Sequence, residues 1–186
     1  MNYQNLVRQY AKILEEFFAN KESLFEEFLN LTTESLKAGH KILVFGNGGS
    51  AAQAQHFAAE MVNKFLKIRL PLKAISLTTD TSALTSISND TSFEYVFSRQ
   101  IEALGEKGDV AVALSTSGNS PNVIKAIEVA KRKELLTAGF TGKGGGQLSQ
   151  RVDYLLDVPS DSTPRIQEAH LLLLHLLAQE LEDRLG

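Results

Sequence analysis

The chain of 186 residues contains no cysteine and no long uninterrupted run of apolar residues. Without cysteine it can have neither a disulfide framework nor a thiolate metal site, and a reducing compartment is compatible with this composition. No segment approaches the ~18 apolar residues of a membrane span. The first residues, Met1 to Asn5, lack the basic and apolar parts of a signal peptide. We therefore expect a soluble, cytoplasmic protein without a membrane partner.

Positive charge is also scarce. The 19 Lys and Arg residues are outnumbered by 22 Asp and Glu residues, so the formal net charge is −3. Proteins that bind nucleic-acid phosphates concentrate Lys and Arg on a basic face, and Lys64, Lys67 and Arg69 make only a small cluster. We expect no nucleic-acid partner. The 43% hydrophobic and 22% charged residues are typical of one folded domain, which we place over residues 1–186.

Helical periodicity dominates the beginning of the chain. Apolar residues recur at helical spacing in two blocks, Leu6 to Phe17 and Leu24 to Leu31, with a break near Asn20 and Lys21. This pattern predicts two N-terminal helices within residues 1–39.

From residue 40 onward, short apolar segments alternate with helical ones. Strands are predicted at 41–45, 72–77, 110–114, 136–140 and 154–158, with helices at about 51–65, 93–104, 121–133 and 164–185. Strands separated by helices predict a mainly parallel, doubly wound sheet covered on both faces, a three-layer α/β/α sandwich over residues 40–186. The glycine-rich stretch at 142–146 is predicted to be a strand-to-helix turn that does not touch the ligand.

The predicted final helix carries leucines around nearly its whole circumference. One face of a sheet cannot bury all of them. An ordinary core helix at the end of the domain is one interpretation. We prefer the other, in which this helix and the N-terminal pair pack against further copies of the chain.

The most informative stretch runs from Gly46 to Glu60, where a buried strand, a GNGGS loop and a helix follow one another. Glycines let a ligand approach the backbone closely. Free N–H groups and the positive end of the dipole at the helix start, near Ser50, favour a phosphate or carboxylate.

A second polar loop, Ser115 to Ser120, follows strand 110–114 and leads into a helix that begins with Pro121. One such loop alone would indicate ordinary turn and cap chemistry. Two of them, both at carboxyl ends of parallel strands, favour ligand binding. Neither contains a Walker or G-x-G-x-x-G motif, so the sequence does not indicate nucleotide hydrolysis or dinucleotide binding.

His56 and Glu60 are four residues apart on the helix after the first loop, so they project from one face. The carboxylate is a candidate general base, and the imidazole is a candidate metal ligand or proton donor. A solvated helix pair is the alternative. The apolar neighbours Phe57 and Met61 favour partial burial instead.

His175 lies among leucines of the final helix. Apolar packing would keep its imidazole neutral, the form that ligates a metal or accepts a proton; a satisfied core or interface histidine is the alternative. Gln167 precedes it by roughly 12 Å along an ideal helix and by about 80° around it. One site could use both residues only through long side-chain reaches or through different subunits.

The segments GNGGS at 46–50, QHFAAE at 55–60, SND at 88–90, LSTSGNS at 114–120 and RIQEAH at 165–170, with a later histidine, together resemble the bacterial phosphoheptose isomerases of the sugar isomerase (SIS) domain family. The resemblance covers essentially the whole chain. It implies an SIS fold and a homotetramer with active sites at or near subunit interfaces. It also implies conversion of sedoheptulose 7-phosphate to D-glycero-D-manno-heptose 7-phosphate through an enediol, the first step toward ADP-heptose for lipopolysaccharide core or a related surface glycan.

The resemblance further implies roles for individual residues. Glu60 and His175 would be the acid/base pair. One zinc ion per subunit would be held by His56, Glu60, Gln167 and His175. Substrate contacts would come from Asn47, Gly48, Gly49, Glu60, Asn89, Asp90, Ser115, Thr116, Ser117, Ser120 and Gln167, and Ser50 is a further candidate for the phosphate.

Two other functions compete with the isomerase. Relatives that bind the replication initiator as tetramers share the loops but look catalytically empty at the glutamate and second histidine positions. Because this chain keeps Glu60 and His175, we favour an enzyme over this non-enzymatic SIS protein. A sugar-phosphate sensor is the third possibility, and it is weakened because no DNA-binding segment is attached.

Overall fold

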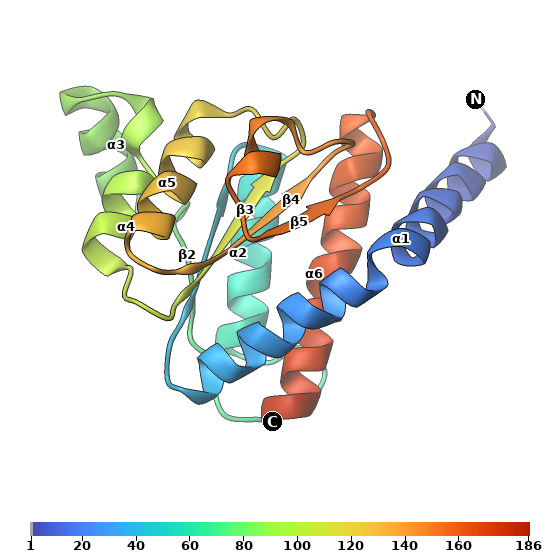
Figure 1. Ribbon diagram of the computed structural model, residues 1–186, viewed down its shortest axis with the longest axis horizontal. Coiled ribbons are helices and arrows are strands. Elements are labelled where there is room, and N and C mark those ends of the chain that lie inside the picture. Colours follow the sequence, from blue (N-terminus) through green and yellow to red (C-terminus); the bar gives the residue numbers. More distant parts are fainter. Residues whose placement is uncertain (1) are drawn as a thin grey trace.

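A parallel sheet of five strands forms the centre of the computed structural model, which describes residues 2–186 (Figure 1). The strands are β1 (Ile42–Gly46), β2 (Ala74–Ser76), β3 (Val110–Ser115), β4 (Leu136–Thr141) and β5 (Tyr154–Asp157), in the order β2-β1-β3-β4-β5. Every residue of β1 and β3 is buried, as expected for strands covered on both faces. The chain winds outward from β1 to β2 and then in the other direction from β3 to β5, which confirms the doubly wound sheet.

Helices cover both faces of the sheet (Figure 1). One apolar core lies between the sheet and α1 (Tyr3–Lys37), α2 (Gly49–Val62) and α6 (Thr163–Leu185). The other lies against α4 (Ser98–Leu104) and α5 (Pro121–Arg132), with α3 (Thr81–Asp90) at its margin. Successive strand residues face opposite cores: Val44 contributes to the first, and Leu43 and Phe45 contribute to the second. The predicted three-layer sandwich is therefore confirmed.

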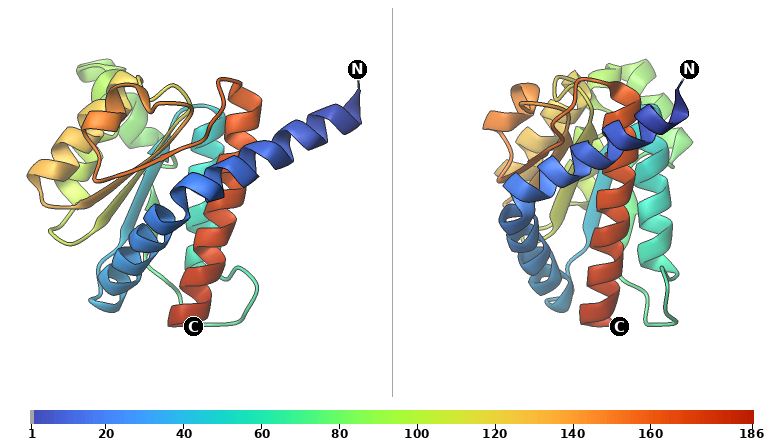
Figure 2. Two further views of the ribbon diagram at one scale, coloured as in Figure 1. Left: turned by 45° about the vertical axis from the view of Figure 1, so that its right-hand side comes forward. Right: turned by 90° about the vertical axis from the view of Figure 1, so that its right-hand side faces the viewer.

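The prediction of two N-terminal helices is wrong, because α1 is one helix from Tyr3 to Lys37. The break in the apolar pattern contains neither glycine nor proline. Asn20 stays helical, and its side-chain amide donates to the carbonyl of Glu16 at 2.7 Å. The helix changes direction near its middle instead of stopping (Figure 2). Its N-terminal end extends beyond the body of the domain and leaves Tyr3 and Val7 exposed.

The segment predicted as one helix at 93–104 is also divided. A short 3₁₀ helix, η1 (Phe93–Tyr95), precedes α4. A second 3₁₀ helix, η2 (Gly146–Gln150), follows the glycine-rich turn after β4. That turn is therefore the strand-to-helix connection that the sequence predicted.

A buried ion pair ties the end of α6 to the loop that follows α2. Glu182 is 1% exposed; its carboxylate accepts the backbone N–H groups of residues 65–67 and the Nε–H of Arg69. Arg69 also donates to the carbonyls of Glu60 and Met61 at the end of α2. Burial alone would raise the pKa of Glu182, but the three backbone N–H groups and the guanidinium lower it overall. The carboxyl end of α2 is thereby held against α6.

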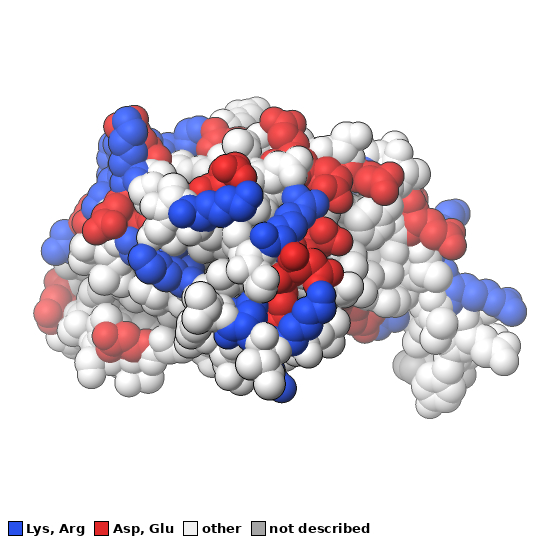
Figure 3. All heavy atoms as spheres, turned by 90° about the horizontal axis from the view of Figure 1, so that it is seen from below, with Lys and Arg blue, Asp and Glu red and all other residues white. Residues whose placement is uncertain are grey.

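Charge is mixed on the face of the protein seen from below (Figure 3). Lys and Arg side chains lie among Asp and Glu side chains there, so this face is not a basic surface. None of the helices in the described part of the chain has the length and apolarity that crossing a membrane requires.

Candidate active site

The two polar loops lie side by side because β1 and β3 are neighbours in the sheet. Gly46 is paired with Leu114, and a Cβ at Gly46 would lie 2.6 Å from the Leu114 carbonyl oxygen. The close approach of the two strand ends therefore requires glycine at this position. The two loops therefore lie together where the winding of the sheet reverses, between β1 and β3. Open α/β sheets bind ligands at this point.

A reciprocal pair of amides joins the two loops. Asn47 donates from Nδ2 to Asn122 Oδ1 at 2.9 Å, and Asn122 donates back to Asn47 Oδ1 at 2.9 Å. Asn122 is 3% exposed and also accepts the N–H of Val123. Sequence reasoning missed Asn122, since an asparagine in the first turn of a helix looks like an ordinary capping residue.

A cavity of about 70 Å³ lies between the loops and the start of α6. Six of the expected substrate residues line it together with Leu114: Asn47, Ser50, Ser115, Thr116, Ser120 and Gln167. The N-cap residues of α2 and α5, Gly48 and Ser120, make no side-chain capping bond. The starts of α2 and α5 and the hydroxyl residues of the second loop therefore surround a space of the size of a small anion.

Gly48 and Gly49 shape this cavity from the backbone. Gly48 has φ of 55°, a left-handed conformation that glycine adopts without strain. A Cβ at Gly49 would lie 2.7 Å from Nε2 of Gln167. The glycine therefore lets the side chain of Gln167 reach the first loop from α6.

A second group of side chains converges farther along α2. Nε2 of His56 lies 3.0 Å from Oε1 of Glu60 and 3.0 Å from Nε2 of His175. Glu60 Oε1 and His175 Nε2 are 3.6 Å apart. Phe65 lies against the His175 ring with 5.5 Å between ring centroids. The i,i+4 pair on α2 and the histidine among leucines on α6 thus form one cluster, a grouping that only the family resemblance had implied.

Comparisons with known proteins agree with this geometry. The family model described as the SIS domain matches residues 5–142. A phosphoheptose isomerase of Desulfovibrio desulfuricans is 55% identical over 172 residues, which cover 92% of this chain and 82% of that protein. The chain belongs to the phosphoheptose isomerase family of SIS domain proteins.

Further members of the family support the same conclusion along the full length of the chain. A phosphoheptose isomerase of Aliarcobacter butzleri is 47% identical over 186 residues, covering 95% of this chain and 98% of that protein. The solved structure of phosphoheptose isomerase from Neisseria gonorrhoeae superposes with a TM-score of 0.90 at 41% identity, covering 98% and 100% of the two chains. The expected enzyme class, an isomerase, is confirmed, and these relatives give no support to the replication-initiator alternative.

Electrostatics distinguish Glu60 within the cluster. Burial raises the pKa of its carboxyl, and the nearby His56 and His175 offset this only in part. Its Oε2 is buried and has no hydrogen-bond partner among the described residues. A carboxylate with one oxygen unpaired and a raised affinity for protons suits a group that takes up a proton from a ligand.

The three donor atoms also suit a metal ion. Ligand atoms of His56, Glu60 and His175 lie within 4.8 Å of one another. Two N/O ligands of a tetrahedral zinc ion are about 3.3 Å apart, and the separations of 3.0, 3.0 and 3.6 Å match that spacing. The chain therefore has a His/Glu group able to hold a metal.

Gln167 lies apart from these three residues, with its side chain at the loop cavity. Its backbone carbonyl accepts a hydrogen bond at 2.6 Å from Gln53, which is on α2 between Ser50 and His56. Oε1 of Gln53 is buried without a partner in the described chain. Sequence reasoning missed Gln53, although its i,i+3 spacing to His56 could have placed it on the same helix face.

Besides Gly48, Gly49 and Glu60, three further expected substrate residues are absent from the lining of the small cavity. Asn89 and Asp90 end α3, where the Asn89 amide donates to the Asp90 carboxylate at 2.8 Å; both are exposed, and α3 is on the side of the sheet away from α6 (Figure 1). Ser117 lines an adjoining cavity. Within residues 2–186, no side-chain hydrogen bond links Asn89 or Asp90 to either loop, so their contact with substrate stays a prediction.

The turn at residues 142–146 supports the second loop. Gly142 donates its N–H to the carbonyl of Thr116 at 2.9 Å. A Cβ on Gly118, which has φ of 64°, would collide with the carbonyl group of Gly145. The glycines therefore let two turns pack backbone against backbone, which gives the glycine-rich stretch a role that the sequence did not reveal.

Proposed function

We propose that this chain interconverts sedoheptulose 7-phosphate and D-glycero-D-manno-heptose 7-phosphate, with Glu60 and His175 as the acid/base pair. The observation that carries the proposal is the convergence of His56, Glu60 and His175 on α2 and α6, the two helices whose starts line the small cavity. The relatives named phosphoheptose isomerase, at 47% and 55% identity, support the substrate.

The reaction moves a carbonyl between C1 and C2 and needs a proton removed from one carbon and returned to its neighbour. Glu60 takes the proton, since burial raises the pKa of its carboxyl and its Oε2 has no protein partner in the described chain. His175, with Nε2 3.6 Å from Oε1 of Glu60, serves the enediol oxygens or the opposite carbon. One carboxylate and one imidazole are sufficient for this chemistry.

The loops hold the phosphate end of the substrate. Hydroxyls of Ser115, Thr116 and Ser120 supply its donors, and the positive dipole ends of α2 and α5 favour its charge. Ser50 adds a hydroxyl from the first loop. Anchoring the phosphate fixes the reacting end near Glu60, which lowers the entropic cost of reaching the transition state.

We further propose that His56, Glu60 and His175 hold one zinc ion per subunit. Because the side chain of Gln167 lies at the loop cavity, a fourth ligand from Gln167 would have to come from another subunit. A bound zinc ion would polarise the carbonyl of the substrate. Glu60 cannot be a metal ligand and a free general base at the same time. The activity that remains after a chelator removes the metal therefore shows whether the metal is needed. If activity survives treatment with a chelator, the metal is structural or regulatory rather than required for turnover.

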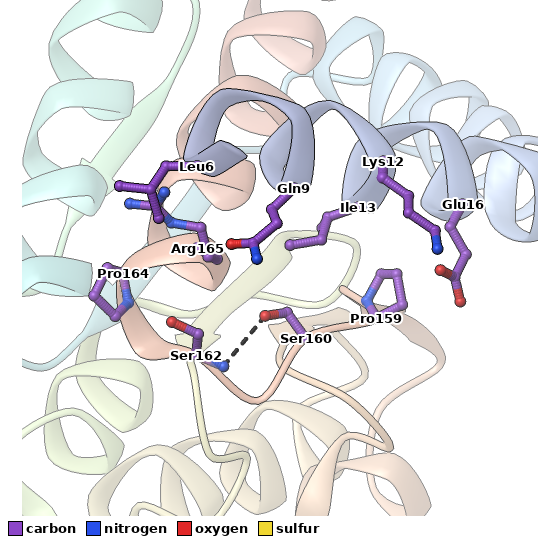
Figure 4. A pocket seen from close by; sticks show the side chains of 10 residues that line it. All are labelled: Leu6, Gln9, Lys12, Ile13, Glu16, Pro159, Ser160, Ser162, Pro164 and Arg165. Atoms are coloured by element: carbon purple, nitrogen blue, oxygen red, sulfur yellow. Dashed lines mark hydrogen bonds between the residues drawn. The ribbon is translucent and has the colours of Figure 1, made fainter. Parts of the chain in front are cut away.

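The assembly we propose is a homotetramer with active sites at or near subunit interfaces. The N-terminal half of α1 overhangs a groove of about 590 Å³ against the 159–165 segment (Figure 4). Leu6 and Ile13 line this groove from α1, and Pro159 and Pro164 line it from the other side. Exposed Tyr3 and Val7 extend the apolar surface. Sedimentation is expected to show a tetramer; a stable monomer at micromolar concentration would contradict the proposal.

The test of function is direct. Purified protein is incubated with sedoheptulose 7-phosphate, and the aldose is followed by NMR with and without chelator. Glu60→Gln is expected to lower kcat by at least about 100-fold and to retain sugar phosphate binding. Glu180→Gln, which changes an exposed carboxylate on α6 paired with Arg184, is the control. Normal turnover by Glu60→Gln would rule out the base, and absence of product from the unmodified protein would favour a binding role.

A further inference from the structure

A larger cavity lies on the other side of the second loop and shares one lining residue with the small cavity. Its volume is about 200 Å³, and the shared residue is Thr116. The walls of the larger cavity are Thr116, Ser117, Lys143, Ser160, Asp161, Thr163 and Ile166. Among the described residues that line either cavity, Lys143 is the one cation.

The backbone holds Lys143 in place beside the second loop. Thr141 at the end of β4 is paired in register with Ser115, and Lys143 follows two residues later. Its N–H donates to the carbonyl of Ser160 at 3.1 Å. The preceding Gly142 has no room for a side chain, because a Cβ there would lie 2.6 Å from the Thr116 carbonyl oxygen. The turn therefore carries Lys143 directly to the wall of the loop.

The ammonium group of Lys143 has no partner on the described part of the protein. Lys143 is exposed, and its ammonium makes no ion pair or hydrogen bond within residues 2–186. Lys107, by contrast, is paired with Glu134 at 2.7 Å. Asp161 lines the same cavity and repels anions. The serine and threonine donors of the second loop have no positive charge of their own, although a phosphate monoester carries nearly two negative charges at neutral pH.

We infer that Lys143 recognises the charge of the substrate's phosphate group across the wall formed by Thr116 and Ser117. The inference rests on the proposed function for the identity of the substrate. The hydroxyls and N–H groups orient the phosphate oxygens, and the ammonium adds long-range attraction that neutral donors cannot supply. Its effect belongs to binding rather than to the proton transfers, because Lys143 lies at the phosphate end of the site.

The test compares Lys143→Gln with Lys107→Gln, which removes the same charge from the exposed pair with Glu134 before β3. Removing one charge close to a dianion in largely aqueous surroundings is expected to raise KM for sedoheptulose 7-phosphate about five- to tenfold. The dissociation constant of inorganic phosphate, measured by calorimetry, should rise by a similar factor. Lys143→Arg should retain tight binding, and Asp161→Asn should shift both constants in the opposite direction.

The increase in KM and in the phosphate dissociation constant that Lys143→Gln causes should become smaller at higher salt, since ionic strength screens exposed charges. The inference would be overturned if KM and the phosphate dissociation constant of Lys143→Gln both stayed within twofold of those of the unmodified protein. It would also be overturned if they did not differ from those of Lys107→Gln. If the unmodified protein makes no aldose, the proposed function fails. The calorimetric comparison of phosphate binding still decides the role of Lys143 in that case.

Discussion

His170 on α6 makes the stability of the fold depend on pH. It is 0% exposed, its Nε2 lies 3.0 Å from the carbonyl oxygen of Thr141, and its Nδ1 is buried without a partner among the described residues. Burial lowers the pKa of this histidine from 6.5 to about 4, although the bond to Thr141 acts in the opposite direction. The unfolded chain therefore binds a proton at pH values where the folded protein does not.

The resulting loss of stability has a defined direction and size. The stabilisation that neutral His170 contributes to folding is fully present above the unfolded pKa of 6.5. It decreases as the pH falls below 6.5 and is lost once the pH falls through the folded value of about 4. The two pKa values correspond to about 3 kcal/mol in all, of which about 2 kcal/mol is lost by pH 5. His170→Gln keeps a side-chain N–H for the Thr141 carbonyl but cannot titrate.

Urea unfolding at pH 8 and pH 5, at one protomer concentration, measures this effect. The free energy of unfolding of the unmodified protein should fall by about 2 kcal/mol more than that of His170→Gln. The difference between the two proteins cancels the titration of all other groups. An NMR titration of the His170 ring gives the folded pKa independently. Equal pH dependence in both proteins, or a ring that titrates near 6.5 in the folded state, would refute the reasoning.

Two further predictions concern the loops. Asn122→Ala leaves the partly buried amide of Asn47 unpaired, so it should cost about 1–3 kcal/mol of unfolding free energy and raise KM for the sugar phosphate; denaturation and steady-state kinetics with unchanged values would disprove the link between the loops. Gly118→Ala should cost at least about 2 kcal/mol, because it combines a left-handed φ with a collision against the Gly145 carbonyl. Gly144→Ala, with φ of 77° and nothing within 4 Å of the added Cβ, should cost only about 1 kcal/mol, and equal losses in the two variants would show that the contact does not matter.

The alternation of strands and helices was predictable from the sequence because short, mainly apolar segments, unbroken in β1 and nearly so in β3, lie between turn residues. The continuity of α1 was not, since the pattern near Asn20 shows only that the apolar face shifts. Whether the helix stops or bends there depends on what the two halves pack against. Most of α1 packs against the core, and only its N-terminal end projects from the domain, which local spacing does not encode.

The candidate site, like the fold, was predictable from the sequence only in part. His56 and Glu60 share a helix face by spacing alone, and the two loops share an edge of the sheet by topology. That His175 joins the first pair while Gln167 joins the loops depends on how α6 crosses α2, a tertiary contact. The amide pair of Asn47 and Asn122 and the position of Lys143 likewise arise from residues far apart in the chain, so single segments gave no signal for them.

Helix α2 carries both halves of the proposed reaction, and this limits which sugars the enzyme can serve. Ser50 at its start lies at the anion cavity, and Glu60 follows ten residues later, about 15 Å along the axis. Side chains that lean toward the start of the helix shorten this gap only in part. In the proposed mechanism, a sugar phosphate held at one end must therefore be long enough to present its carbonyl at the other, and the length of this helix segment would select substrates by their number of carbon atoms.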